Sequence, residues 1–267
     1  MGSRGTFGRE KITLAVVVIA CLLVVIGLAV DHARTEPPAA HSDGSDDAGT
    51  NLYLGPDIDK YDVPRGSRVL FFGDSYTEGW GAEDLADGYA YQMSGLMGWD
   101  VTVRGVGGTG YLDKGSKNEG NYVTRIERLD AVGPYSLIVL QGGSNDQAAL
   151  PRSESGVIDT TPLSISVEQA FNAMQAKYPN TPIIMLGPVS TGEKVNPDKQ
   201  AVDATLSSFA YARGVHYISP IAGRWFLSSE REELIDERTG HPNGLGYEKM
   251  ARMLKRQLNA YLVDPID

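Results

Sequence analysis

The sequence predicts an α/β protein in which one parallel sheet of about five strands lies between two layers of helices. Five short apolar runs recur along the chain after residue 67, at 68–72, 101–103, 137–140, 183–186 and 215–218. Gly, Ser or Pro occurs within two residues after each run, and runs of this length are typical of strands buried on both faces. Stretches with helical periodicity separate them, and such alternation indicates βαβ units and a three-layer α/β/α sandwich.

The predicted helices carry apolar residues three and four positions apart. This spacing occurs in residues 166–178 and 246–262, and residues 198–213 form a further candidate. In the last segment Tyr247, Met250, Leu254 and Leu258 lie on one helical face, which predicts an amphipathic helix that closes the fold.

A different kind of segment precedes this domain. Residues 12–30 (ITLAVVVIACLLVVIGLAV) contain no charge, and at 1.5 Å per residue they reach about 28 Å, enough to cross a membrane. Because Arg4, Arg9 and Lys11 precede the run and acidic residues follow it, we expect residues 1–11 to stay in the cytoplasm and the rest to be exported. The alternative is a cleaved signal peptide and a secreted domain.

Residues 31–66 predict a flexible extracytoplasmic linker, and residues 67–267 the folded domain. From residue 35 the linker is rich in Pro, Gly, Ser, Ala and Asp, although its second half contains enough apolar residues to pack partly as a strap. The net charge of −10 argues against a nucleic acid partner, which would require a basic face.

Polar and glycine-rich blocks follow the first three predicted strands. Ser75 comes directly after the first strand, a glycine cluster at 105–110 follows the second, and Asn145 follows the third. Because active sites of parallel sheets lie at the carboxyl ends of the strands, a hydroxyl and several hydrogen-bond donors are expected to converge there. Taken singly, each block has another interpretation. The segment around Ser75 could be a helix cap, the glycine cluster a phosphate loop, and Asn145 a residue that stabilises its own turn. His241, on a loop before the last helix, is the one plausible general base.

The order of these blocks resembles the SGNH (GDSL-type) hydrolase superfamily over residues 67–264. The blocks are GDSYTEG (73–79), the glycine loop, GGSND (142–146) and HPN (241–243). The resemblance implies a flavodoxin-like fold and ester hydrolysis without a cofactor or metal. It makes Ser75 the nucleophile, His241 the base, and Ser75, Gly108 and Asn145 the oxyanion hole, with Gly105 or Gly107 as other registers of the glycine.

One block departs from the family pattern. The family usually has Asp three residues before the histidine, where this chain has Arg238. Asp236 is therefore predicted to orient the imidazole, and the alternatives are Glu237 and, third, a Ser–His pair steadied by a backbone carbonyl, in no order of preference.

The predicted function is a serine esterase that acts through an acyl-Ser75 intermediate on acyl or acetyl esters. A membrane-anchored enzyme outside the cytoplasm would meet envelope carbohydrate and lipid esters. Tyr76, Trp80 and Tyr111 flank the blocks and are candidate substrate contacts, although aromatic residues so placed are as often packing residues. Two alternatives remain open: an O-acyltransferase with the same site, and a glycan- or lipid-binding module with a decayed site.

Overall fold

A five-stranded parallel sheet forms the centre of the protein. The computed structural model describes residues 60–130, 132–192 and 194–266. The strands are β1 (Arg68–Gly73), β2 (Asp100–Gly105), β3 (Leu137–Gln141), β4 (Ile183–Leu186) and β5 (Tyr217–Ile218). Their spatial order is β2-β1-β3-β4-β5, which is the flavodoxin-like order implied by the sequence. The predicted parallel sheet is confirmed, with β5 beginning two residues later than expected.

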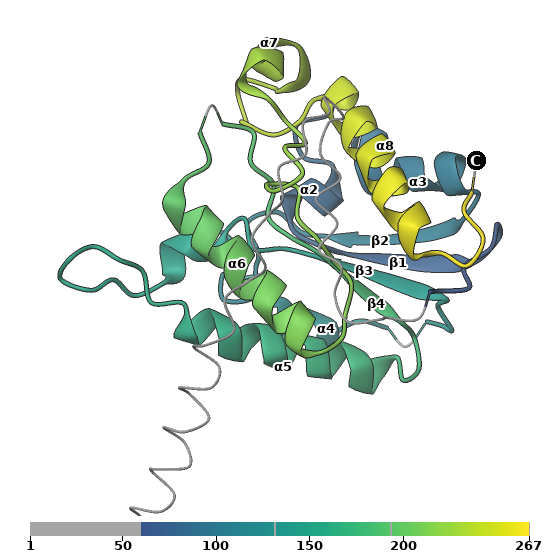
Figure 1. Ribbon diagram of the computed structural model, residues 1–267, viewed down its shortest axis with the longest axis horizontal. Helices are drawn as coiled ribbons and strands as arrows, with labels where there is room; N and C mark the ends of the chain where they lie inside the picture. The colour runs from purple at the N-terminus through teal and green to yellow at the C-terminus, as the bar shows by residue number, and fades with distance from the viewer. Residues whose placement is uncertain (1–59, 131, 193, 267) are drawn as a thin grey trace, which may run out of the picture. The chain divides into compact units, whose positions relative to one another are not determined.

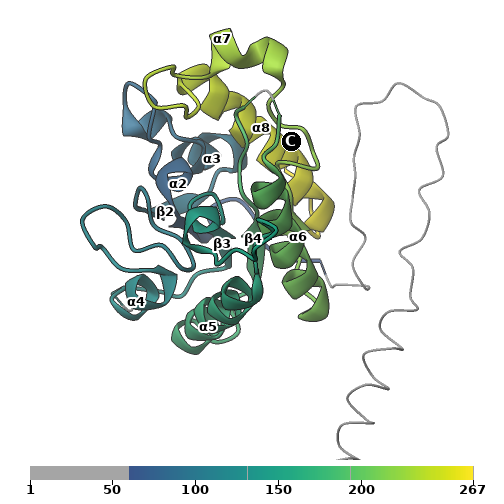
Figure 2. The same cartoon turned by 90° about the vertical axis from the view of Figure 1, so that its left-hand side faces the viewer.

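Helices cover both faces of the sheet. Figures 1 and 2 show α3 (Tyr89–Met97) and α8 (Gly244–Tyr261) on one face, and α4 (Tyr122–Glu127), α5 (Thr161–Lys177) and α6 (Pro197–Ala212) on the other. The chain order explains this, because right-handed crossovers from β1 outwards in both directions place helices on opposite faces. Short elements complete the domain: α2 (Ser75–Glu78), η1 (Leu85–Asp87), η2 (Asp146–Ala149), η3 (Ser228–Glu230) and α7 (Arg231–Leu234).

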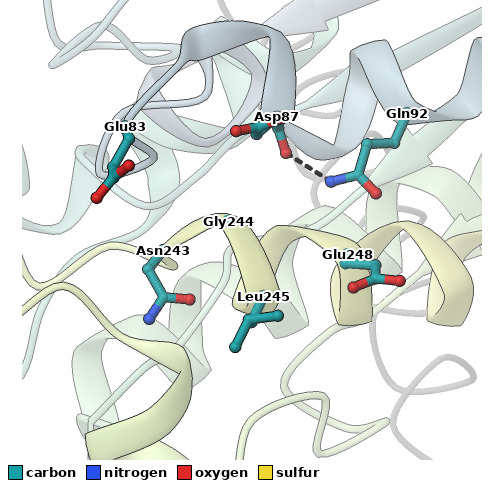
Figure 3. A pocket seen from close by; sticks show the side chains of 7 residues that line it. All are labelled: Glu83, Asp87, Gln92, Asn243, Gly244, Leu245 and Glu248. Carbon is teal, nitrogen blue, oxygen red and sulfur yellow. Dashed lines mark hydrogen bonds between the residues drawn. The ribbon is translucent and has the colours of Figure 1, made fainter.

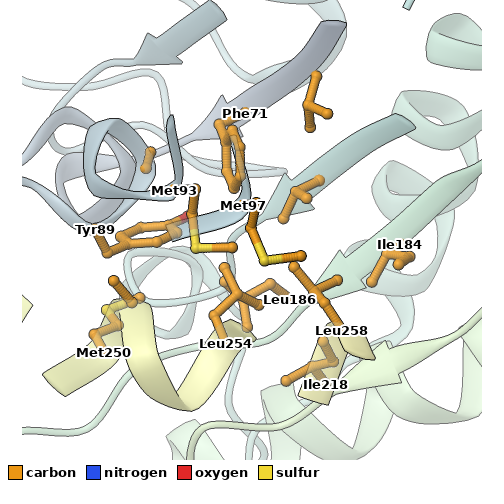
Figure 4. Close-up of a cluster of buried hydrophobic side chains, with 14 of the residues drawn as sticks. Phe71, Tyr89, Met93, Met97, Ile184, Leu186, Ile218, Met250, Leu254 and Leu258 are labelled. Atoms are coloured by element: carbon orange, nitrogen blue, oxygen red, sulfur yellow. The ribbon is translucent and has the colours of Figure 1, made fainter. Parts of the chain in front are cut away.

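The central strands are buried on both faces, as their continuous apolar sequences predict. Phe71 points into a core beneath α3 and α8, and its neighbour Phe72 points into a second core beneath α4 and α5. Figure 4 shows Phe71 among Met93, Met97 and Leu254. Each large apolar side chain buried in this way stabilises the fold by roughly 1.5–3 kcal/mol.

The end of the predicted linker already belongs to the domain. The backbone of Tyr61 pairs with the segment after α8, because its N–H donates to the Tyr261 carbonyl and its own carbonyl accepts from Val263. Val63 is buried, and its carbonyl accepts the indole N–H of Trp99. The domain therefore begins before residue 67, and the expected strap is present over these residues.

The predicted membrane span at 12–30 and most of the linker lie outside the described residues. Within the described part of the chain, no helix is long and apolar enough to cross a membrane.

Candidate active site

Ser75 is the first residue of α2, directly beyond the carboxyl end of β1. Asp74 caps this short helix, since its carboxylate accepts the N–H of Tyr76 at 2.9 Å. The other carboxylate oxygen accepts from Gln141 Nε2 at 3.1 Å, which ties the turn to β3. Burial raises the pKa of Asp74 to about 6. The N–H of Ser75 lies at the start of a helix, where backbone donors have no partner within the helix.

His241 reaches Ser75 from the loop before α8. Nε2 of the imidazole lies 2.8 Å from the Ser75 hydroxyl, and Nδ1 lies 3.0 Å from the carbonyl oxygen of Thr239. Because a carbonyl only accepts hydrogen bonds, Nδ1 carries the proton and Nε2 accepts from the hydroxyl. The Tyr76 ring packs against the imidazole, with the ring centres 4.8 Å apart. Burial is the main cause that lowers the pKa of His241 below its ordinary value.

Asp236 does not contact the imidazole, so the preferred prediction for the third residue is wrong. Its carboxylate accepts from the backbone and side chain of Arg238 and from the Thr239 hydroxyl, at 3.1 to 3.3 Å. Compared with the family pattern, two extra residues lie between Asp236 and His241. They form a turn in which the Asp236 carboxylate bonds to residues of the turn itself and not to the imidazole. Glu237 is exposed and makes no hydrogen bond to His241 within the described residues. The geometry matches the third alternative, a Ser–His pair steadied by a backbone carbonyl.

The glycine loop after β2 carries a free backbone donor at Gly108, which lines the same cavity as Ser75. Gly108 has a φ of +74°, a conformation that favours glycine, and among the described residues its N–H has no hydrogen-bond partner. The N–H of Gly107 donates to the Glu78 carboxylate at 2.8 Å, and Gly105 lies within β2. Among residues 106–109, Gly108 is therefore the one whose N–H has no partner in the described structure, since the N–H groups of Val106 and Thr109 donate to backbone carbonyls.

Asn145 lies beyond β3, beside the same loop. Its Nδ2 donates to the Thr109 carbonyl at 2.9 Å, which leaves the second N–H of the amide for a ligand. One cavity of about 390 Å³ brings the predicted residues together; it is lined by Ser75, Glu78, Trp80, Val106, Gly107, Gly108, Ser116, Lys117, Glu119, Asn145 and His241.

The three candidate substrate contacts differ in exposure. Trp80 is half exposed and lines the cavity. Tyr76 and Tyr111 are 5% and 0% exposed, belong to the two cores and are not part of the cavity lining, so their contact with substrate stays a prediction.

A second cavity, of about 520 Å³, is lined by residues of η1, α3 and the start of α8. Figure 3 shows its lining, in which Glu83 and Asp87 face α8 and Gln92 donates to the Asp87 carbonyl. No Ser, His, Cys or Lys lines it, so it offers no nucleophile for acyl transfer. Across the described residues, no group of three or more His, Cys, Asp or Glu side chains is placed to hold a metal ion.

The family follows from comparison with known proteins. A model of the GDSL-like Lipase/Acylhydrolase family matches residues 71–249. The chain belongs to this family. The resemblance to SGNH (GDSL-type) hydrolases is thereby confirmed, and the chain is a serine ester hydrolase.

Individual relatives agree with this assignment. A GDSL lipase of Mycobacterium tuberculosis is 28% identical over 204 residues, which cover 73% of this chain and 83% of the lipase. A carbohydrate acetylesterase from Sinorhizobium meliloti is 15% identical with a TM-score of 0.56, covering 73% of this chain and 99% of that one. A family two carbohydrate esterase from Clostridium thermocellum, solved with cellohexaose, is 15% identical with a TM-score of 0.56, covering 74% and 65%. At these identities the two structures show that the fold is shared.

Sequence reasoning missed three residues that shape the site. Thr239 supplies the carbonyl for Nδ1, Glu78 binds the glycine loop, and Arg125 binds the ends of β1 and β2. Glu78 lies within the GDSYTEG block, so its nearness to Ser75 could have been predicted. Arg125 lies on α4, outside every block of the motif in sequence, and no sequence signal points to it.

The orientation of His241 by a carbonyl predicts that Asp236→Asn retains kcat within about threefold of wild type. Asn still accepts from the backbone of Arg238, so the loop is kept, whereas loss of a true triad carboxylate costs about 10⁴-fold in kcat. Steady-state kinetics with p-nitrophenyl acetate measure this, and Glu237→Gln provides a matched exposed control. A fall of about 10³-fold or more in Asp236→Asn alone would restore Asp236 as the third catalytic residue.

Proposed function

We propose that this protein hydrolyses short acyl esters, with acetylated carbohydrate as its preferred substrate class, through an acyl-Ser75 intermediate. The observation that carries the proposal is the 2.8 Å contact between the Ser75 hydroxyl and Nε2 of His241 at the wall of an open cavity. A serine hydroxyl that donates to a neutral imidazole is the arrangement that activates a serine nucleophile.

In the proposed reaction, Nε2 of His241 takes the Ser75 proton while Oγ attacks the ester carbonyl carbon. The carbonyl oxygen becomes negative and is bound by the N–H groups of Ser75 and Gly108 and by the Asn145 amide. When the carbonyl re-forms, the bond to the alcohol breaks, and the imidazolium returns its proton to that alcohol. A water molecule, deprotonated by the same imidazole, then attacks the acyl carbon. The bond to Ser75 Oγ breaks, Oγ takes the proton from the imidazolium, and the acid is released.

The cavity favours a small acyl group on a polar alcohol. Glu78, Lys117 and Glu119 place charged groups around Ser75, while Trp80 and Val106 are the only large apolar residues of the lining. A long acyl chain would leave these charges desolvated, whereas sugar hydroxyls can bond to them. The exposed Trp80 ring offers a flat apolar face of the kind on which a sugar ring stacks. The fold shared with two carbohydrate esterases is consistent with this choice.

An acyltransferase would use the same acyl-Ser75 and replace water by an acceptor hydroxyl. A salicylyl-acyltransferase from a tetracycline biosynthetic pathway has a similar fold, at 18% identity and a TM-score of 0.56. Product analysis in the presence of sugar acceptors separates the two activities.

The proposal also includes attachment to the membrane with the catalytic domain outside the cytoplasm, which rests on the sequence of residues 1–66.

Ser75→Ala tests the proposed nucleophile. Because no other hydroxyl in the cavity is bonded to His241, kcat for p-nitrophenyl acetate is expected to fall by about 10⁴-fold or more without a change in thermal unfolding. The full-length protein is assayed with p-nitrophenyl esters from acetate to palmitate and with acetylated oligosaccharides. Ser229→Ala, an exposed serine on η3, is the control. Undiminished hydrolysis by Ser75→Ala contradicts the nucleophile, and preference for palmitate contradicts the substrate class.

The lowered pKa of His241 predicts the pH dependence of kcat/KM. The base must be neutral to accept the Ser75 proton, and burial extends the neutral form to lower pH. Activity is therefore expected to stay constant down to about pH 6.5, the ordinary histidine value, and to fall as pH drops below it. A pH series of kcat/KM reports the pKa in the free enzyme. An acidic limb with its midpoint above about 7 is the opposite result, since it requires a carboxylate beside the imidazole.

A further inference from the structure

Residues 105–109, here called the oxyanion loop, are held by two side chains of opposite charge. Glu78 binds the loop from α2, and Arg125 binds both ends of it from α4. Neither residue is one of the four that carry the reaction in the mechanism above. Their hydrogen-bond partners belong to the last residue of β1 and to residues 104–109.

Glu78 fixes the middle of the oxyanion loop. Its carboxylate accepts the Gly107 N–H at 2.8 Å, and the Gly107 backbone lies so close that an added Cβ would be 3.0 Å from Oε2. Because Glu78 ends the helix that Ser75 begins, this bond ties the loop to the nucleophile. The bond also occupies the donor of Gly107, so that Gly108 supplies the free N–H.

Arg125 fixes the two ends of the same loop. One guanidinium nitrogen donates to the Gly73 carbonyl at 2.8 Å and to the Thr109 hydroxyl at 2.6 Å, and the other donates to the Arg104 carbonyl at 2.8 Å. Gly73 ends β1, Arg104 precedes the loop, and Thr109 closes it. A planar guanidinium with several donors can bridge these acceptors, which a lysine ammonium or an apolar side chain cannot reproduce.

The burial of Arg125 argues against a role in fold stability alone. The residue is 8% exposed, and within the described part of the chain no carboxylate is among its hydrogen-bond partners. Its guanidinium carbon lies 4.4 Å from the centre of the Phe72 ring. A buried charge without a direct counter-ion is costly, and well-packed apolar residues often stabilise a fold equally well. Its three hydrogen bonds instead hold the chain before and after the loop, which is what a positioning role requires.

We infer that Glu78 and Arg125 are positioning residues that set the oxyanion loop, so that the Gly108 N–H meets the negative oxygen formed during attack by Ser75. The inference rests on the proposed acyl transfer at Ser75. Both side chains act through the loop and touch no reacting atom. Their loss should lower kcat, with KM for a small ester almost unchanged, because the oxyanion exists only along the reaction path.

Four variants of the full-length protein test this inference with p-nitrophenyl acetate. Glu78→Ala frees the loop and is expected to lower kcat about tenfold or more, whereas Glu78→Gln keeps an oxygen that accepts from Gly107 and should restore most of kcat. Arg125→Met is expected to lower kcat about 10²-fold, the loss that a misplacement near 1 Å produces, and Arg125→Lys should fall between it and wild type. Glu127→Ala and Arg256→Met, both exposed, are controls that should match wild type.

Thermal unfolding of each variant separates positioning from stability. Folded Glu78→Ala with wild-type kcat overturns the inference, as does a loss in Glu78→Gln equal to that in Glu78→Ala. A loss confined to KM also overturns it, since it places the residues in substrate binding. If Arg125→Met fails to fold, the Glu78 pair decides the outcome. Wild-type enzyme without esterase activity would instead contradict the proposed function.

Discussion

The parallel register of β1 with its two neighbours is the constraint on which the catalytic site depends. Gly73 at the end of β1 pairs with Gly105 of β2, and Phe72 pairs with Leu140 of β3. Three loops therefore leave the sheet at one edge, and β1 lies between the strands from which the others start. β2 and β3 lie on opposite sides of β1, so the strand order reverses there. A crevice at the carboxyl ends of the strands is expected at such a point.

The side chains behind this edge hold the loops in fixed relative positions. Gln141 joins the Asp74 turn to β3, and Asn145 joins β3 to the oxyanion loop. Asp146 extends the same connection, since it is fully buried and accepts the N–H groups of Leu112 and Asp113. Every such bond links two segments that are far apart in sequence. The hydroxyl and its donors are therefore preorganised before substrate arrives, which is the main source of electrostatic catalysis.

His241 is the component that the sheet does not position. Its loop is held instead by Thr239, whose carbonyl fixes Nδ1, and by Thr191, whose hydroxyl donates to the Gly240 carbonyl at 2.6 Å. A carbonyl fixes the tautomer as well as a carboxylate does but contributes no negative charge to the imidazolium. As the proposed base, His241 is therefore expected to be weaker than in a complete triad, in line with its lowered pKa.

The sequence was informative where one residue type satisfies a strict local requirement. Buried strands need unbroken apolar runs, so the five strands were predictable, as were Ser75, Gly108 and Asn145 as neighbours at one sheet edge. Helix α3 was not predicted, although Tyr89, Met93 and Met97 have helical spacing, because two glycines border it and a third interrupts it. Asp236 could not be placed by sequence, since the path of a turn depends on which hydrogen bonds its side chains form. Arg125 was out of reach because two of its three hydrogen-bond partners are backbone carbonyls, which leave no trace in sequence.

The acyl-Ser75 intermediate is the central claim, and its direct observation is the most decisive measurement. The full-length protein is mixed with p-nitrophenyl acetate, quenched with acid during turnover, and analysed by intact mass and peptide mapping. One added acetyl group is expected, located on Ser75 and absent from Ser75→Ala. An acetyl group on another residue, or rapid turnover with no acylated wild-type protein at any quench time, would contradict an acyl-Ser75 intermediate.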